Sequence, residues 1–274
     1  MNSKKQESQN KNWKKNSIKN ISQEQSVNEF KVEGRNAVIE LLKSDREINK
    51  IFVAKGERQG SINEIIKLAK QRRVIVTEVD RNKLDTYSET KHHQGVIAFV
   101  SPVEYKDVDD ILEIAKEKGE DPFILIADEI EDPHNLGALI RSAEIAGCHG
   151  VIIPKRRATG VTEVVAKVSV GATEYVPIAR VNNLNETIQE LKDKGVWIVG
   201  TDGSANTLYY EQDMTGPIAI IVGSEGRGMN KLTMKNCDFL VKIPMMGKIT
   251  SLNASVSGGI VLFEALHQRL QHNS

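Results

Sequence analysis

The feature that most constrains the fold is a pair of uninterrupted apolar segments, residues 123–127 (FILIA) and 218–222 (IAIIV). A strand with one face in solvent alternates apolar and polar residues, whereas a strand covered on both faces is apolar throughout. Segments with helical spacing alternate with these and other short apolar runs. From residue 122 onward, the chain is therefore predicted to form an α/β domain with a parallel sheet.

The expected elements of this domain follow one another with short connections. They are a charged helix at 108–118, a strand at 123–127, a helix at 135–147, a strand at 150–153, a helix at 162–168, a strand at 175–178, a helix at 184–194, strands at 196–201 and 218–222, a short helix at 230–235, a strand at 239–243 and a helix from about Asn253. In the last helix, the spacing of Val256, Ile260, Phe263 and Leu270 predicts one buried stripe.

The N-terminal part predicts a separate, smaller α/β domain at 29–101. Helices are expected at 35–43 and 61–71, a third short one after a cap at Asp80, and strands at 50–54, 74–77 and 95–100. Residues 102–106 (PVEYK) then form a linker to the domain at 107–274. We therefore expect helices packed on a sheet in both domains.

The formal net charge of the 274 residues is zero, but the charge is unevenly distributed. Residues 1–28 carry six lysines against two glutamates among many Asn, Gln and Ser residues, which predicts a disordered basic tail. A solvated tail and an RNA-contacting tail are equally compatible with this composition. Further candidate RNA contacts at 29–101 are Lys70, Arg72, Arg73, Lys91, His92 and His93, although for each a solvated face is the default interpretation.

Composition also excludes several classes of protein. No run reaches the roughly 18 apolar residues of a membrane helix, and the N-terminus lacks the apolar core of a signal peptide. The two cysteines, Cys148 and Cys237, are far apart and lack metal-ligand spacing. We therefore expect a reduced, cytoplasmic protein with no membrane segment and no metal.

Three loops at strand ends contain the unusual residues. In a parallel sheet, ligands bind at the carboxyl ends of the strands. The first loop leads to Asn135, which stands at an expected helix cap, and to Arg141, whose side chain can lean back toward the helix start. For a lone Arg141, a surface or ion-paired side chain is the default interpretation. The second loop contains Gly223 and Glu225, and we expect Glu225 to lie opposite Arg141.

The third loop, residues 243–253, combines apolar side chains with hydroxyl groups and a glycine. A surface turn does not require that mixture, whereas a pocket for a partly apolar ligand does. Common nucleotide and hydrolase motifs are absent: the chain has no G-x-G-x-x-G turn after the first strand of this domain, no P-loop and no G-x-S-x-G elbow. Residue patterns alone therefore indicate an α/β enzyme with an unusual ligand loop.

Residues 135–141 (NLGALIR), 223–228 (GSEGRG) and 243–256 (IPMMGKITSLNASV) resemble, in this order, the three motifs of the SpoU/TrmH family of RNA ribose 2′-O-methyltransferases. The resemblance covers about 107–274 as the catalytic domain. Residues 32–38 (VEGRNAV) and 93–96 (HQGV) also resemble the substrate-binding domain of the RlmB-type branch.

The resemblance implies a C-terminal trefoil knot (the SPOUT class), an L30e-like substrate-binding domain and a homodimer. It also implies S-adenosylmethionine as cofactor, held by Gly223, Ile243 and Leu252. The resemblance also makes Arg141 the proposed base. Because a guanidinium keeps its proton at neutral pH, an equally consistent role for Arg141 is to orient the ribose or its phosphate. Glu225 is expected to fix Arg141, while Asn135, Ser251 and Asn253 orient the hydroxyl and the loop.

The expected function is methyl transfer from S-adenosylmethionine to a ribose 2′-hydroxyl, with a guanosine of large-subunit ribosomal RNA as the favoured substrate. One alternative is a transfer RNA methyltransferase of the same family. Another is a non-catalytic RNA-binding or assembly protein, although the presence of Arg141, Glu225 and Asn253 disfavours it.

Overall fold

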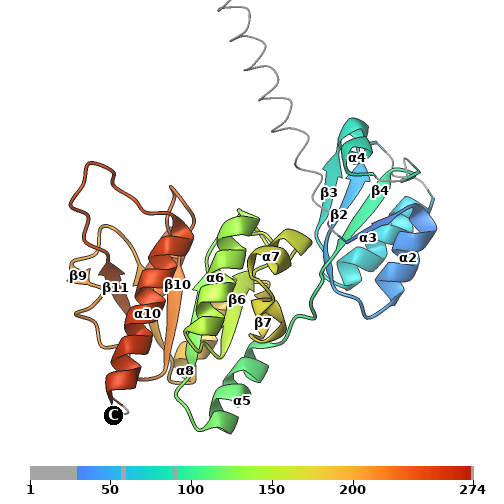
Figure 1. The fold of residues 1–274 in the computed structure, drawn as a ribbon. Coiled ribbons are helices and arrows are strands. Elements are labelled where there is room, and N and C mark those ends of the chain that lie inside the picture. Colours follow the sequence, from blue (N-terminus) through green and yellow to red (C-terminus); the bar gives the residue numbers. More distant parts are fainter. Residues whose placement is uncertain (1–29, 57–59, 89–91, 273–274) are drawn as a thin grey trace, which may run out of the picture.

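The computed structural model describes residues 30–56, 60–88 and 92–272, which form two sheets with separate hydrophobic cores (Figure 1). The predicted tail at 1–28 and Lys91 lie outside the described residues. The smaller sheet belongs to the N-terminal part of the chain and the larger one to the C-terminal part.

The smaller sheet has four strands in the order β1-β4-β2-β3, of which only β2 and β3 pair in parallel. Its elements are β1 (Lys31–Glu33), α2 (Arg35–Lys43), β2 (Ile48–Ala54), α3 (Ser61–Gln71), β3 (Val76–Val79), α4 (Arg81–Tyr87) and β4 (Val96–Val100). The predicted helices at 35–43 and 61–71 are confirmed. The predicted strand at 74–77 begins two residues later, because Arg73 adopts a φ of 56° and the Val74 amide still bonds to Ala69 at the end of α3.

Two side chains that were candidate RNA contacts, Arg72 and His93, form hydrogen bonds within this domain instead. The Arg72 guanidinium donates to the carbonyl oxygens of Leu41 (3.1 Å), Ser44 (2.7 Å) and Arg46 (3.0 Å), and so satisfies the end of α2. The buried His93 accepts a bond from the Gly95 amide at 3.0 Å through Nδ1. Both side chains therefore stabilise the domain itself.

The larger sheet has seven strands in the order β7-β6-β5-β10-β8-β11-β9, and every pairing is parallel, as predicted. Its elements are α5 (Val108–Lys118), β5 (Phe123–Ala127), α6 (Pro133–Ile145), β6 (Gly150–Pro154), α7 (Glu163–Val168), the short 3-10 helix η1 (Ala172–Glu174), β7 (Ile178–Val181), α8 (Leu184–Asp193), β8 (Trp197–Thr201), β9 (Thr207–Leu208), β10 (Ile218–Val222), α9 (Lys231–Asn236), β11 (Phe239–Lys242) and α10 (Ala254–His272).

Helices cover both faces of this sheet, which explains its uninterrupted apolar strands. Within β5, Phe123 and Leu125 join the core beneath α6, α7 and α10, whereas Ile124 and Ile126 join the core beneath α5 and α8. The strand expected at 175–178 is wrong by three residues: the turn that follows η1 occupies the start of this stretch, and β7 begins at Ile178, after Pro177. Proline has no amide hydrogen to donate to a sheet.

The stripe predicted to be buried in α10 lies on the opposite face. Val256, Phe263 and Leu270 are 49%, 44% and 60% exposed, so the prediction is wrong for these three residues, whereas Ile260 is half-buried. The buried face consists of Ala254, Gly258, Val261, Leu262 and Ala265. Small residues are required there because α10 lies close to α6: a Cβ added to Gly258 would be 2.4 Å from Leu139 Cδ2.

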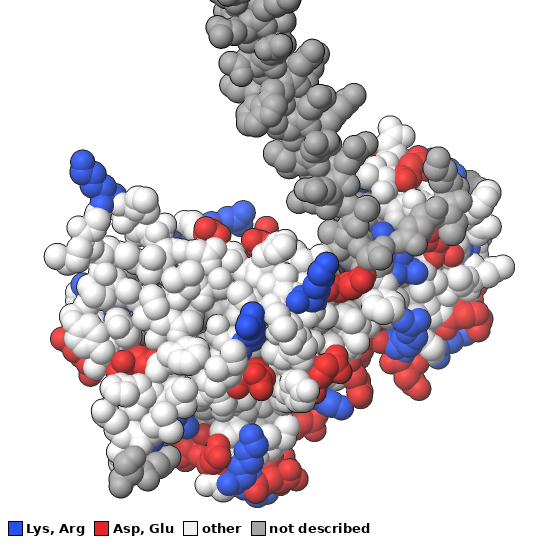
Figure 2. All heavy atoms as spheres, viewed as in Figure 1, with Lys and Arg blue, Asp and Glu red and all other residues white. Residues whose placement is uncertain are grey.

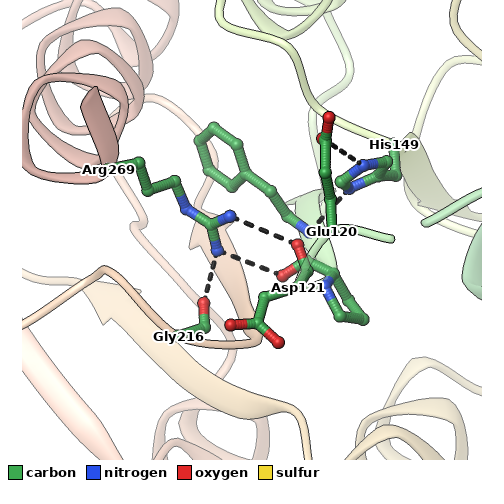
Figure 3. Close-up of polar contacts among 7 residues, drawn as sticks. Glu120, Asp121, His149, Gly216 and Arg269 are labelled. Carbon is green, nitrogen blue, oxygen red and sulfur yellow. Dashed lines mark hydrogen bonds and ion pairs between the residues drawn. The ribbon is translucent and has the colours of Figure 1, made fainter. Parts of the chain in front are cut away.

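The end of α10 is fixed at the edge of the sheet where the strands begin (Figure 3). The Arg269 guanidinium donates to the carbonyl oxygens of Asp121 (3.2 Å) and Pro122 (3.3 Å), and it lies 4.7 Å from the centre of the Phe123 ring. His149 accepts the Phe123 amide at 3.0 Å and contacts Glu120 at 3.1 Å. Burial lowers the pKa of both Arg269 and His149. These contacts fix the start of β5 at the edge opposite the site described below.

Across the described ranges, we find no helix with both the length and the apolarity needed to span a bilayer.

Candidate active site

The three loops singled out in the sequence meet at the carboxyl edge of the larger sheet. They follow β5, β10 and β11, which are parallel and close together in the strand order. Parallel strands bring their carboxyl ends to one edge, and the loops therefore converge there.

A hydrogen-bonded group of Asn135, Glu225 and Asn253 joins these loops. The Asn135 amide nitrogen donates to Glu225 Oε2 at 3.2 Å, and its oxygen accepts from Asn253 Nδ2 at 2.8 Å. Asn253 Nδ2 also lies 3.4 Å from the same Glu225 oxygen. Asn135 is buried, so an unsatisfied amide at this position would be costly. We call these three residues the amide triad.

Asn135 occupies a different helical position from the predicted one. The residue that caps α6 is Asp132, whose carboxylate accepts the His134 amide at 2.9 Å, and Pro133 follows as the first helical residue. Proline is well suited to that position because the amide it lacks has no partner within the helix. The cap predicted at Asn135 is therefore wrong, and its side chain is available for the triad.

Asn253 both starts α10 and completes the triad. Its Oδ1 accepts bonds from the Ser255 amide (3.0 Å), the Ser255 hydroxyl (2.6 Å) and the Val256 amide (3.3 Å). A side-chain oxygen that satisfies the first free amides of a helix is a cap. The oxygen serves the helix and the nitrogen serves the triad, which links the position of α10 to the geometry of the site.

Gly223 is required by the fold of its own loop. A Cβ at this position would lie 2.3 Å from both the Gly228 carbonyl carbon and the Met229 nitrogen. The loop closes through reciprocal backbone bonds between Ser224 and Gly228, at 3.0 and 2.9 Å. Close packing of backbone on backbone excludes every larger residue here.

A cavity of about 170 Å³ lies beside the triad, and five predicted site residues line it, namely Gly223, Glu225, Ile243, Ser251 and Leu252. The outer wall, residues 245–251, is exposed along its whole length, and Met246 is 97% exposed. The cavity is therefore bounded on its solvent side by an exposed segment of chain.

Arg141 lies apart from this group. It is exposed on α6 and forms no hydrogen bond or ion pair with the described residues. The expectation that Glu225 fixes Arg141 is wrong, because the Glu225 carboxylate bonds to Asn135 and Asn253 instead. Asn135 lies in the first turn of α6, and Arg141 follows about 9 Å further along the axis.

Asp128, at the end of β5, also organises the site but was missed in the sequence. Its Oδ2 accepts the Asn230 amide at 2.9 Å, which joins β5 to the segment that follows the glycine loop. Burial raises the pKa of this carboxyl group. An acidic residue placed directly after an apolar strand was the available signal.

Two further cations were missed, Lys155 and Arg156, which directly follow β6. The signal was the basic run Lys155-Arg156-Arg157 at a strand end. In the described part of the chain, no cluster of three or more His, Cys, Asp or Glu residues is arranged to hold a metal ion.

Two models of known protein families match the chain, one in its C-terminal part and one in its N-terminal part. Residues 122–263 match the model described as the SpoU rRNA Methylase family. Residues 31–106 match a model described as RNA 2′-O ribose methyltransferase substrate binding.

The chain belongs to the SpoU rRNA methylase family. A relative in Bacillus subtilis (strain 168), named as a TrmH family tRNA/rRNA methyltransferase, YacO, is 50% identical over 236 residues, which are 86% of this chain and 94% of the relative. This relative is therefore similar to the chain over most of the length of both.

Solved structures support the same assignment. The SpoU methyltransferase AviRb from Streptomyces viridochromogenes, in complex with the cofactor AdoMet (S-adenosylmethionine), has a TM-score of 0.57 and 25% identity, with 88% of this chain and 91% of that chain covered. An RNA 2′-O ribose methyltransferase has a TM-score of 0.51 and 28% identity, with coverages of 88% and 89%. The larger parallel sheet is thus the fold of SpoU methyltransferases.

Proposed function

We propose that this protein transfers a methyl group from S-adenosylmethionine to a ribose 2′-hydroxyl of RNA. The observation that supports this most is the amide triad, which joins three loops beside a cavity within the segment matched by the SpoU model. The description of the second family model, which names RNA 2′-O ribose methyltransferases, supports the choice of the ribose oxygen.

The residues around the cavity fit this cofactor. Ile243 and Leu252 provide an apolar wall for the adenine, and loop backbone groups are available to bond its edge. Glu225 and Asp202 place carboxylates at the same cavity, and the cofactor carries two positive centres, the sulfonium and the amino group. A relative crystallised with AdoMet adds to this support. The bound cofactor supplies an electrophilic methyl carbon.

The protein must hold the ribose hydroxyl in line and remove its proton, because a neutral hydroxyl is a poor nucleophile. In our proposal, the amide triad fixes the loops around the cavity and Ser251 contacts the ribose. Arg141, exposed and without a partner among the described residues, orients the ribose or its phosphate. As the oxygen–methyl bond forms, the carbon–sulfur bond breaks, and the hydroxyl proton leaves to a nearby base.

For the substrate, we propose a guanosine of large-subunit ribosomal RNA, as in the RlmB-type branch. The substrate-binding domain at 31–106 is the main support. The relative YacO is named for both tRNA and rRNA, and transfer RNA is therefore the second candidate. Either substrate would place the enzyme in the cytoplasm.

We also propose a homodimer in which a second copy covers the exposed face of α10. Val256, Phe263 and Leu270 are seven residues apart and share this face, each at least 44% exposed. Figure 2 shows a largely uncharged surface over α10 and α6.

We further propose that the C-terminal part of the chain forms the trefoil knot of the family. In support of this proposal, the chain passes from β11 through the loop at 243–253, and α10 then packs on α6 and β10.

The test is methyl transfer from radiolabelled S-adenosylmethionine to unmodified transcripts of ribosomal and transfer RNA. We expect label in large-subunit ribosomal RNA with the wild type and none with Glu225→Ala. If only transfer RNA becomes labelled, transfer RNA and not ribosomal RNA is the substrate. Absence of transfer to any RNA, with cofactor binding intact by calorimetry, would refute the proposed activity.

A further inference from the structure

A second cavity, of about 630 Å³, lies between the two domains. Lys70 and Arg73, at and just after the end of α3, line it from the smaller domain. Lys155 and Arg156, which directly follow β6, line it from the larger domain. We call these four residues the cation groove. The remaining lining residues, Val74, Ile75 and Asn182, include no acidic side chain.

The four charges lack partners among the described residues: none of them forms an ion pair there. Arg157, the next residue along the chain, does form one, with Glu129 at 3.3 Å. Burial, followed by the nearby charge of Arg180, lowers the pKa of Lys155. Glu47 and Asp107 act on Lys155 from further away without forming an ion pair with it. Four cations around one cavity that has no acidic side chain in its lining create a positive potential that favours an anion.

Hydrogen bonds hold the two walls of the groove in place. Arg180, on β7, donates to the Asn49 side-chain oxygen and backbone oxygen, both at 3.1 Å. Asn49, on β2, donates to the Val161 carbonyl at 2.9 Å and accepts the Tyr105 hydroxyl at 2.8 Å. We call Asn49, Tyr105, Val161 and Arg180 the domain latch.

The latch is tightly packed, since a Cβ on Gly160 would lie 2.3 Å from Asn49 Oδ1. Asn49 itself is buried. Because buried, paired polar groups separate only at a cost, the latch fixes the distance between the two cationic walls. The groove is therefore formed before any ligand arrives.

The groove opens on the same edge of the sheet as the candidate active site. Lys155 and Arg156 follow β6, which pairs in parallel with β5, and the loop after β5 leads to the amide triad. Between them, Glu129 contacts Arg157 at 3.3 Å and Asn230 at 3.5 Å. A polymer that lies in the groove can thus continue along this edge to the cavity.

We propose that the cation groove binds the phosphodiester backbone of the RNA whose ribose is methylated, so that one strand contacts both domains. This inference rests on the proposed function. A polyanion fits better than a small anion, because the cations stand on two walls that belong to different domains. Phosphate contacts of this kind fix the register of the RNA without reading its sequence.

The experiment measures how the affinity for a fluorescent single-stranded oligouridine changes with salt concentration. The first variant carries Lys155→Gln and Arg156→Gln, and the second carries Lys70→Gln and Arg73→Gln. The matched control carries Lys116→Gln and Lys118→Gln, two cations at the end of α5, on the opposite edge of the sheet. Each phosphate contact on a single strand contributes about 0.7 to the slope of log affinity against log salt.

We expect each groove variant to lower this slope by up to about 1.4, which corresponds to two contacts, while the control keeps the wild-type slope. Calorimetry should show unchanged affinity for S-adenosylmethionine in all three. Equal slopes in wild type and both groove variants would overturn the proposal. A lower slope in only one of the two groove variants would also overturn it. So would binding of phosphate or polyglutamate to the groove without binding of oligouridine.

Methyl transfer by the wild type separates this inference from the proposed function. If the wild type methylates RNA and the groove variants do so with unchanged KM, the groove proposal fails while the function stands. If the wild type methylates no RNA, the proposed function fails whatever the groove binds.

Discussion

Asn253 allows helix capping to be separated from the organisation of the site. In Asn253→Ala, α10 loses its cap, which costs about 1 kcal/mol. The buried Asn135 oxygen also loses its donor at 2.8 Å, which costs roughly 1–3 kcal/mol. The sum of about 2–4 kcal/mol should lower the Tm of the catalytic domain by roughly 4–16 °C, at about 2–4 °C per kcal/mol for a domain of this size.

Asn253→Ser should behave differently, because serine caps a helix about as well as asparagine but lacks the amide that reaches Asn135 and Glu225. We expect it to recover about 1 kcal/mol relative to Asn253→Ala. Methyl transfer should nevertheless fall about 100-fold in both variants, since loss of the triad misplaces the loops around the cavity.

The assays are thermal unfolding by circular dichroism and single-turnover methyl transfer well below the Tm of every variant. Ser255→Ala is the matched control, because it removes one bond to the Asn253 oxygen at 2.6 Å and leaves the amide in place. Full activity in Asn253→Ser would refute the role of the amide triad. So would an activity that follows stability across the three variants.

Four further outcomes are expected. Arg141→Ala should keep its affinity for S-adenosylmethionine in calorimetry but lose about 100-fold in single-turnover transfer; equal transfer would remove Arg141 from the mechanism. The buried His149 has a lowered pKa, so the wild type should lose stability as pH falls below about 6.5, and His149→Gln should flatten this dependence in denaturant unfolding between about pH 5.5 and 7; parallel pH curves would contradict it. Phe263→Glu should convert a dimer to a monomer in sedimentation, whereas a wild-type monomer would exclude the proposed interface. Asn49→Ala removes the side-chain bonds to Tyr105, Arg180 and Val161 and keeps only the backbone bond from Arg180, so it should speed proteolysis between the domains at unchanged cofactor affinity; unchanged cleavage would show that the latch does not join them.

Sequence reasoning succeeded where local pattern and packing agree. The segment FILIA is a central strand because helices cover both its faces, and continuous apolarity is the direct signal of such burial. The loops at Asn135, Gly223 and Asn253 converge because their strands are parallel neighbours or nearly so. The family motifs added the cofactor and the reaction, which no residue pattern supplies.

Prediction from the sequence failed where contacts between distant residues determine which side chains meet. The apolar spacing of Val256, Phe263 and Leu270 indicates a stripe but does not say which side of α10 meets the sheet, and close packing on α6 selects the side with Gly258. The pairing of Glu225 depends on which side chain reaches it in space. The cation groove joins residues more than 80 positions apart, and no local signal predicts such a meeting.

The central claim is that this chain methylates a ribose oxygen, and nucleoside mass spectrometry tests it most directly. An unmodified large-subunit ribosomal RNA transcript is incubated with the protein and S-adenosylmethionine, and then digested to nucleosides and to mapped fragments. We predict one 2′-O-methylated nucleotide, a guanosine, at a single position, and none with Glu225→Ala. A methyl group on a base, or unmodified RNA despite bound cofactor, would contradict the account.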